Sequence, residues 1–259
     1  MSDTWEFSGL EFAAAWNAVK ESLPDPFVYR SGTTYYDDAC REKYEAWQRI
    51  RTRWGHELEE LMAVLAVPDI RLVIRGIDGR DARNAKGSIR LLASRKGNRA
   101  FLVTQKPGTE ERTGGFTVVE HDVLTLGHSV AAALPAVDAG QRSAFDLIEH
   151  GGKGDGLDYS YGRSLVNDVE DRAASRSESF DRAPAATVGT IVVEQGHSRF
   201  GPRGITRSHL AWRDLIDDGR YVIVPGKPPT VVAADVRRLA ELINARIVEV
   251  VQSIKDERI

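Results

Sequence analysis

Histidines, carboxylates and glycines are the residues in this chain whose spacing could support catalysis, metal binding or phosphate binding. His121 and His128 lie seven residues apart, which on a helix separates them by two turns, too far for one ordinary zinc site. His56 is followed by glutamates but lacks the His-Glu-x-x-His spacing. Residues 196–201 have the glycine spacing that opens a phosphate loop, yet Pro202 stands where the lysine is needed. The sequence therefore predicts no catalytic residue, no metal and no cofactor.

The single cysteine and the N-terminal segment bear on where the protein works. Cys40, alone in the chain, excludes an internal disulfide framework. It lies on the apolar face of a predicted helix, so we expect a small buried hydrophobic residue and not a reactive thiol. The chain lacks a basic start followed by an apolar core, and no apolar run approaches the roughly 18 residues that span a bilayer. These features predict a cytoplasmic protein with no direct membrane insertion.

Charge is balanced overall but uneven along the chain. The 259 residues carry a formal net charge of -3, which gives no general reason to expect a nucleic acid or an anionic membrane as a partner. Segment 70–106 differs, because ten lysines and arginines stand against two aspartates, a net charge of +8. Three interpretations stay open: a solvated sheet face whose arginines pair with an acidic helix, a docking surface for an acidic protein, or a nucleic-acid-binding module. Phe101 is the one ring in this segment that could stack on a base.

Two helices are predicted before the first long strand. Ser8 and Glu11 have the spacing of a capping box, and Phe7 with Phe12 fits a hydrophobic staple, so a helix begins at this point. From residue 36 to 65 apolar side chains recur every three or four positions, which is the period of one helix face. We expect Gly55 to kink or split this second helix.

The next part of the chain predicts an antiparallel meander followed by a helix. Four segments alternate apolar and polar residues, which is the period of a strand, and turns rich in glycine or proline separate them. These segments are 70–77, 88–95, 99–105 and 116–120. A helical pattern then covers 123–134 and ends at Pro135.

A short repeat indicates that this unit occurs twice. The sequence TVVEHDV at 117–123 returns as TVVAADV at 230–236, and the run that begins at Arg99 resembles the run that begins at Arg220. The second copy predicts strands and a long C-terminal helix after a flexible connector at 151–156 and a polar, mobile stretch at 175–186. Its strands are 187–195, 205–215, 220–224 and 230–232, and its helix starts near 233. We therefore predict an α+β fold with a central antiparallel sheet, two quasi-two-fold related halves, and helices that cover the sheet at two ends.

The whole chain also resembles a known family, the EspG proteins, which are chaperones of type VII (ESX) secretion. The resemblance rests on the order of loosely patterned segments over nearly the full length. They are the opening Trp5-Glu-Phe-Ser-Gly-Leu-Glu-Phe-Ala-Ala-Ala-Trp16, the helix at 57–66 that leads to Pro68, the paired runs at 99–103 and 220–224, and the final helix start at 233–239. The resemblance implies one EspG-like domain over 1–259, with halves at 1–150 and 157–259, and a sheet flanked by two helical bundles.

The resemblance further implies a binding function without catalysis. Family members hold the exposed hydrophobic tip of a PE–PPE heterodimer and keep it soluble for secretion, so the implied partner is a PE–PPE-type heterodimer and not a nucleic acid. Covering an apolar tip lowers the free concentration of an aggregation-prone surface. The contact residues implied in this sequence are Arg80, Asp81 and Arg83 at the tip of the 78–87 loop, together with Phe200, Trp212, Leu239 and Ile243.

Overall fold

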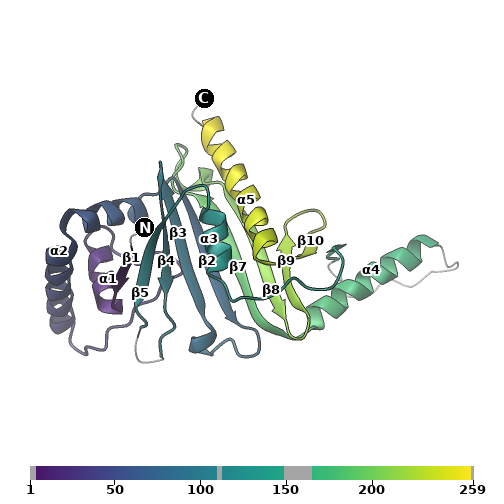
Figure 1. Cartoon of the computed structure of the whole chain (residues 1–259), viewed down its shortest axis with the longest axis horizontal. Coiled ribbons are helices and arrows are strands. Elements are labelled where there is room, and N and C mark those ends of the chain that lie inside the picture. Colours follow the sequence, from purple (N-terminus) through teal and green to yellow (C-terminus); the bar gives the residue numbers. More distant parts are fainter. Residues whose placement is uncertain (1–3, 110–112, 149–164, 258–259) are drawn as a thin grey trace.

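A computed structural model describes residues 4–109, 113–148 and 165–257, and in this part of the chain ten strands form one antiparallel sheet (Figure 1). The connector expected at 151–156 lies outside the described residues. The helices are α1 (Gly9–Asn17), α2 (Tyr36–Ala66), α3 (Leu126–Ala132), α4 (Leu165–Arg182) and α5 (Val236–Glu257). The strands are β1 (Thr4–Phe7), β2 (Ile70–Asp78), β3 (Ile89–Lys96), β4 (Arg99–Gln105), β5 (Phe116–His121), β6 (Phe145–Asp146), β7 (Ala185–Gln195), β8 (Arg207–Leu215), β9 (Gly219–Val224) and β10 (Thr230–Ala233). The predicted α+β class and the antiparallel sheet are confirmed.

The local signals at the N-terminus act as predicted. The Ser8 hydroxyl accepts a hydrogen bond from the Glu11 backbone N–H at 3.2 Å, and the Glu11 carboxylate accepts one from the Ser8 N–H at 2.8 Å. The rings of Phe7 and Phe12 lie 5.8 Å apart, so the staple is formed as well. Gly55 interrupts α2 with φ 50° and ψ -123°, which confirms the predicted kink. These contacts fix α1 and the second part of α2 against one end of the sheet.

The expectation for Cys40 was wrong, because its side chain is exposed. The first turns of α2 extend past the core, and Tyr36 and Tyr44 on the same stretch are also exposed. Continuous burial on this helix starts only at Ala46 and Ile50. Apolar periodicity alone therefore placed the start of the packed face two to three turns too early.

The centre of the sheet is the antiparallel pair β2 and β7. Nine residue pairs run from Ile70 opposite Gln195 to Asp78 opposite Thr187. The strand order is β1-β5-β4-β3-β2-β7-β8-β9-β10-β6, so the strands of the first half lie on one side of this pair and those of the second half on the other, except that β6 from the first half closes the far edge beside β10. Two short strands form the edges, β1 with four residues and β6 with two.

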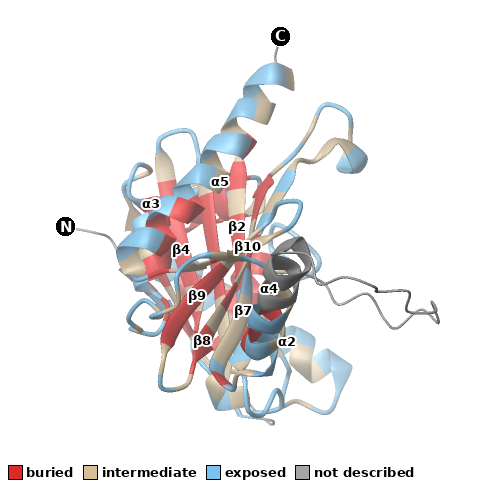
Figure 2. Ribbon diagram, turned by 90° about the vertical axis from the view of Figure 1, so that its right-hand side faces the viewer, coloured by how far each residue is buried: buried red, intermediate tan, exposed pale blue. Residues whose placement is uncertain are grey.

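One face of the sheet carries α3 and α5, which lie side by side (Figure 1). Leu126 and Val130 of α3 and Leu239 and Ile243 of α5 belong to the same core cluster as the inward side chains of β2, β3, β7 and β8. Figure 2 shows the buried residues following the strands, whereas the outer side of α5 is exposed. The helices that end the two halves therefore pack against each other over the middle of the sheet, and not at separate ends as expected.

The opposite face is covered at its two ends and open in the middle. A second core cluster joins α1 and α2 to Val73, Leu92 and Phe101, all on this face. At the other end, Phe180 of α4 packs against Tyr221 of β9, with ring centroids 5.6 Å apart. The stretch 175–186, expected to be mobile, is thus the end of a packed helix and the start of β7. Its polar residues misled the prediction because only one side of α4 is buried.

Both halves place an arginine at the start of their third strand in a two-point ion pair. Arg99 Nε and Nη2 donate to the two carboxylate oxygens of Glu120 at 2.8 and 3.1 Å. Arg220 Nε and Nη2 donate in the same way to Asp214 at 2.6 and 3.0 Å, and this pair is buried. Arg220 Nη2 also donates to the Pro135 carbonyl at 2.9 Å. The arginines at the start of the two repeated runs therefore both form two-point ion pairs, but Arg99 pairs with the following strand β5 and is partly exposed, whereas Arg220 pairs with the preceding strand β8 and is buried.

Trp212 occupies a slot made by two glycines. Gly76, Gly189 and Trp212 are neighbours across β2, β7 and β8. The indole lies over both glycines, and a Cβ atom on Gly189 would collide with it and with the Arg75 carbonyl. Glycine at these positions makes room for the ring, which covers the backbone that the glycines leave bare. Trp212 is therefore a core residue at the centre of the fold.

Replacing Gly189 with alanine should destabilise the protein by roughly 1–3 kcal/mol, because the indole and a backbone carbonyl are both in the way of the new methyl group. Urea unfolding followed by tryptophan fluorescence measures this. Gly32→Ala is the matched control, since a Cβ there meets no atom within 4 Å, and its effect should stay within about 0.5 kcal/mol. Equal stability of the two variants would contradict the proposed slot.

Candidate partner-binding surface

The seven residues proposed as partner contacts lie in three different settings. Arg80, Asp81 and Arg83 are exposed on the 79–88 loop between β2 and β3. Phe200 is also exposed, at 68%, on the 196–206 loop between β7 and β8. The remaining three, Trp212, Leu239 and Ile243, are buried in the core cluster beneath α3 and α5. Their apolar spacing reflects core packing, so in this structure they are not available to a partner.

Asp78 organises the 79–88 loop. Its carboxylate accepts hydrogen bonds from the backbone N–H groups of Arg80 at 2.9 Å and Asp81 at 3.4 Å, and from the Asn84 amide at 2.7 Å. These donors, with the Arg80 N–H as the strongest, hold the pKa of Asp78 below its usual range. Asp81 in turn accepts from the Arg83 N–H at 3.0 Å. The loop therefore presents its arginines from a hydrogen-bonded framework.

The same loop is fastened to the start of the second half. The Gly79 N–H donates to the Ala186 carbonyl at 3.0 Å, and no Cβ fits at Gly79 because the Ala185 carbonyl is too close. This junction follows directly on the C-terminus of α4. The 79–88 loop, the α4–β7 junction and the adjoining ends of β2, β7 and β8 together form what we call the loop end of the sheet.

A shallow hollow of about 360 Å³ lies on the open sheet face at the loop end. Its apolar lining includes Ile77, Val188 and Ala211, with Arg75 and Arg213 beside them. Ile77 is 42% exposed, an unusual position for a large aliphatic side chain in a central strand. Sequence reasoning missed these residues, although it placed Arg75 and Ile77 on one strand face. The missing information was which part of that face the helices leave uncovered. We call this feature the arginine-lined hollow.

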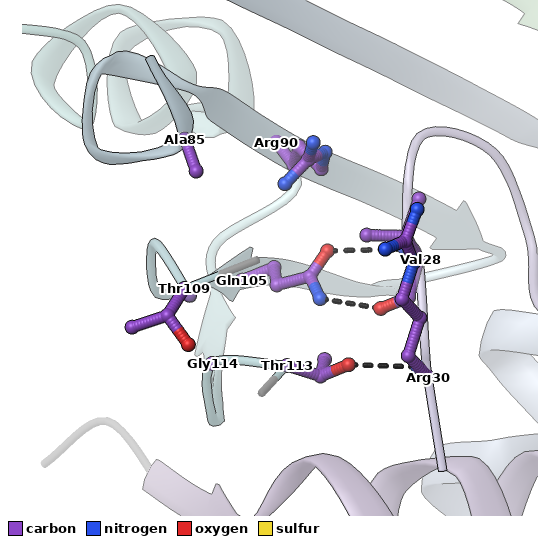
Figure 3. A pocket seen from close by; sticks show the side chains of 9 residues that line it. Val28, Arg30, Ala85, Arg90, Gln105, Thr109, Thr113 and Gly114 are labelled. Carbon is purple, nitrogen blue, oxygen red and sulfur yellow. Dashed lines mark hydrogen bonds between the residues drawn. The ribbon is translucent and has the colours of Figure 1, made fainter. Parts of the chain in front are cut away.

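Two further pockets border the same loop. One, of about 260 Å³, lies between β3, β4 and the segment that connects α1 to α2 (Figure 3). In it the Gln105 amide accepts from the Val28 N–H at 3.2 Å and donates to the Val28 carbonyl at 2.7 Å, and Arg90 lies on the neighbouring strand. The other, of about 430 Å³, lies between Lys86 and the end of α3 at Pro135. Hollowed surface is thus concentrated around the 79–88 loop.

The excess of basic residues in segment 70–106 is partly neutralised by acids from elsewhere in the chain. Arg71 pairs with Glu194 of β7, Arg75 with Asp25, and Lys106 with Glu6. Only Arg99 reaches the acidic helix α2, through Glu60 at 2.9 Å. Phe101, the one ring considered for base stacking, is fully buried. A solvated face paired mainly with α2, and a base-stacking surface, are therefore both disfavoured.

The described residues hold no cluster of three or more His, Cys, Asp or Glu side chains that could bind a metal ion. The Nδ1 atom of His121 lies 3.1 Å from the Ser129 hydroxyl, and burial lowers the pKa of this histidine. In the same part of the chain, no helix has the length and apolar character needed to cross a membrane. The loop end offers apolar contact through Ile77, Val188 and Ala211 and charge through its exposed arginines.

Phe200 lies at the opposite end of the central strands. The Ser198 hydroxyl donates to the Glu257 carboxylate at 2.9 Å, which ties the 196–206 loop to the C-terminal end of α5. The Arg199 guanidinium lies 5.2 Å from the Phe200 ring centroid. Because β2 and β7 are antiparallel, the two loops are separated by the length of nine strand residues, about 30 Å. The structure does not bring Phe200 together with Arg80 and Arg83.

Comparisons with known proteins identify a family and a fold. A profile of the EspG family matches residues 8–245. A solved structure of the Mycobacterium tuberculosis type VII secretion system chaperone EspG5, in complex with a PE25–PPE41 dimer, matches with a TM-score of 0.53 at 13% sequence identity. This match covers 95% of this chain and 96% of that one. No curated protein matches.

Asp78→Ala should loosen the 79–88 loop without unfolding the sheet, because it removes the acceptor of three hydrogen bonds on an exposed loop. We expect faster amide hydrogen exchange at Arg80 and Asp81. In the wild type the same loosening should occur on acidification. A carboxyl group whose folded pKa is lowered stabilises the loop above its unfolded pKa of about 3.9, and this effect is lost as the pH falls through the lower folded value.

Hydrogen exchange read out by mass spectrometry or NMR measures both effects. The control is Asp122→Ala, which removes the acceptor of the Leu124 N–H at the opposite end of the strands and should leave exchange in the 79–88 loop unchanged. Unaltered exchange at Arg80 in Asp78→Ala would mean that the loop is held by other contacts.

Proposed function

The chain belongs to the EspG family, and we propose on this basis that it is a specificity chaperone that binds the exposed hydrophobic tip of PE–PPE heterodimers for type VII (ESX) secretion. The observation that carries the proposal is the family match over residues 8–245. The likeness in fold to EspG5, which was solved with a PE25–PPE41 dimer, supports it. A non-enzymatic role in the cytoplasm follows from this proposal, since the work of such a chaperone is binding alone.

We place the partner contact at the loop end. Helix tips are recognised by apolar grooves in which a few side chains are anchored, and rim charges select among partners. The loop end offers an apolar hollow, two further pockets and exposed arginines on an ordered loop. The Phe200 end offers one exposed ring and a smaller pocket of about 130 Å³ that His197, Arg199 and Glu257 line. One helical hairpin tip does not cover both, because they are about 30 Å apart.

Binding nucleic acid through segment 70–106 is the alternative with less support. Phosphate binding relies on free lysines and arginines, and several of those in this segment already have carboxylate partners. Buried Phe101 offers no stacking surface. The family match also speaks for a protein partner.

The architecture suggests that the domain arose by internal duplication. We infer that the single domain over 1–259 consists of two duplicated halves, 1–150 and 157–259, each with a meander and a helix. The strand order supports this inference, since β2, β3, β4 and β5 extend in sequence on one side of the β2–β7 pair and β7, β8, β9 and β10 on the other. The helices that cover the two ends of the sheet, α1 and α2 at one end and α4 at the other, would then correspond to the two bundles that the family resemblance implies.

Co-expression with candidate PE–PPE pairs should yield a stable heterotrimer with at least one pair. Replacing Arg80 and Arg83 with glutamate should change its affinity or its partner preference, with an effect that shrinks as salt is raised, because exposed charges are screened. Affinity measured by calorimetry at low and high salt tests this. The same double reversal at Arg95 and Lys96, at the far end of β3, is the control. Failure to form a complex with any pair would overturn the proposed function.

Phe200→Asp distinguishes the two ends of the sheet. The ring is exposed, so the melting temperature should be unchanged. With the contact at the loop end, the heterotrimer should form with unchanged affinity at every salt concentration. A complete loss of the complex without a change in melting temperature would move the site to the 196–206 loop.

A further inference from the structure

The open sheet face carries two groups of charges that differ in how they are neutralised. In the group away from the 79–88 loop, Arg71 and Arg207 share the carboxylate of Glu194, which is buried between them, and Arg207 Nε lies 2.7 Å from it. A buried carboxylate with two guanidinium partners satisfies its hydrogen-bonding capacity within the chain. This group therefore needs nothing from outside.

The group at the loop end lacks such a buried acid. Arg75 and Arg90 lie directly opposite each other on β2 and β3, a like-charge cross-strand pair that opposes sheet pairing. Arg90 donates to the Ser88 hydroxyl at 3.1 Å and has no salt bridge among the described residues. Burial and the charge of Arg75 both lower its pKa. Positive charge is therefore concentrated beside an apolar hollow and is not fully compensated.

Arg213 does not remove this excess, because most of its hydrogen bonds go to backbone. Its guanidinium donates to the carbonyls of Phe180 at 2.7 Å and Ala183 at 2.8 Å, at the C-terminal end of α4. The carboxylate of Asp181 is 3.8 Å away and 60% exposed. Arg213 thus fixes α4 beside the hollow and adds to the positive potential there.

The counter-ion of Arg75 shows which chemistry the site accepts. Asp25, from the segment between α1 and α2, pairs with Arg75, and both side chains are more than half exposed. An exposed ion pair of this kind contributes little to stability and is readily exchanged. A carboxylate delivered by a partner could therefore take the place of Asp25.

We propose that the arginine-lined hollow receives an apolar side chain from the partner's tip, and that this tip carries a carboxylate that replaces Asp25 on Arg75. The proposal rests on the proposed chaperone function, and it specifies in addition that the tip of the PE–PPE partner is acidic. Ile77, Val188 and Ala211 supply the apolar floor. Arg75 is the residue that selects an acidic tip, since a neutral or basic tip would leave the Arg75 and Arg90 charges facing each other without relief.

Asp25→Asn is the most informative variant, because it removes the internal competitor and leaves the hollow intact. It should tighten binding of the PE–PPE pair that forms the heterotrimer, by several-fold to about tenfold at low salt. Arg75→Gln should weaken the same complex by a similar factor. Both changes should fade between about 0.05 and 0.5 M salt. Ile77→Ser should weaken binding at every salt concentration, because it acts through apolar contact.

Two controls are needed: one shows that the variants remain folded, and the other shows that the position of the removed charge matters and not the net charge alone. Melting temperatures of all variants should stay close to that of the wild type, since the three side chains are partly or largely exposed. Lys96→Gln removes one positive charge at the other end of β3 and should leave affinity unchanged. Substituting each carboxylate of the partner tip by its amide should identify one whose loss makes the complex insensitive to Arg75→Gln.

The outcomes distinguish this inference from the function on which it rests. If a PE–PPE pair binds and neither Asp25→Asn nor Arg75→Gln changes its affinity by more than about twofold, the acidic-tip inference is wrong and the chaperone function stands. If no PE–PPE pair binds the wild-type protein, both the acidic-tip inference and the proposed chaperone function are wrong. Displacement of the pair by a DNA or RNA duplex at physiological salt would show that the arginines serve a nucleic acid, and would also overturn the inference.

Discussion

The pairing of β2 with β7 is the contact on which the rest of the structure depends. It joins the meander β2–β5 to the meander β7–β10, and its nine residue pairs set how these two groups of strands are aligned. The same pairing brings the 79–88 loop against the start of β7, and so places the loop beside α4. It also puts Gly76 next to Gly189, which creates the slot for Trp212. A shift of one residue in this register would turn the hydrophobic side chains of both halves to the wrong faces.

Much of the fold could be predicted because local sequence determined it. The alternation in the meander, the turns at glycine and proline, and the Ser8–Glu11 cap depend on near neighbours in the chain, and each of these elements forms within a few residues of its predicted bounds. The placement of whole helices could not be predicted in the same way. Apolar periodicity shows that a helix face is buried but not what covers it, so the joint packing of α3 and α5 and the exposure of Cys40 came only from the tertiary structure.

The candidate site was predictable only in part, for a related reason. The family resemblance pointed to Arg80, Asp81 and Arg83; the structure shows that they are exposed, and their role as contacts stays a prediction. Trp212, Leu239 and Ile243 were not distinguishable from surface anchors, since a buried side chain and a binding side chain are chosen from the same residue types. The hollow at Ile77, Val188 and Ala211 combines three strands from both halves. Nothing in the sequence around any one of these residues marks the surface that they form together.

The strand order has a further consequence for contacts with other proteins. A sheet edge with free backbone groups is a template on which other strands can add. Here the long strands are all interior, and the two edges are closed by four residues of β1 on one side and two residues of β6 on the other. The exposed side chains of β1 are polar, and Lys106 pairs with Glu6 beside it. The described part of the sheet thus leaves only short stretches of edge backbone open to strand addition.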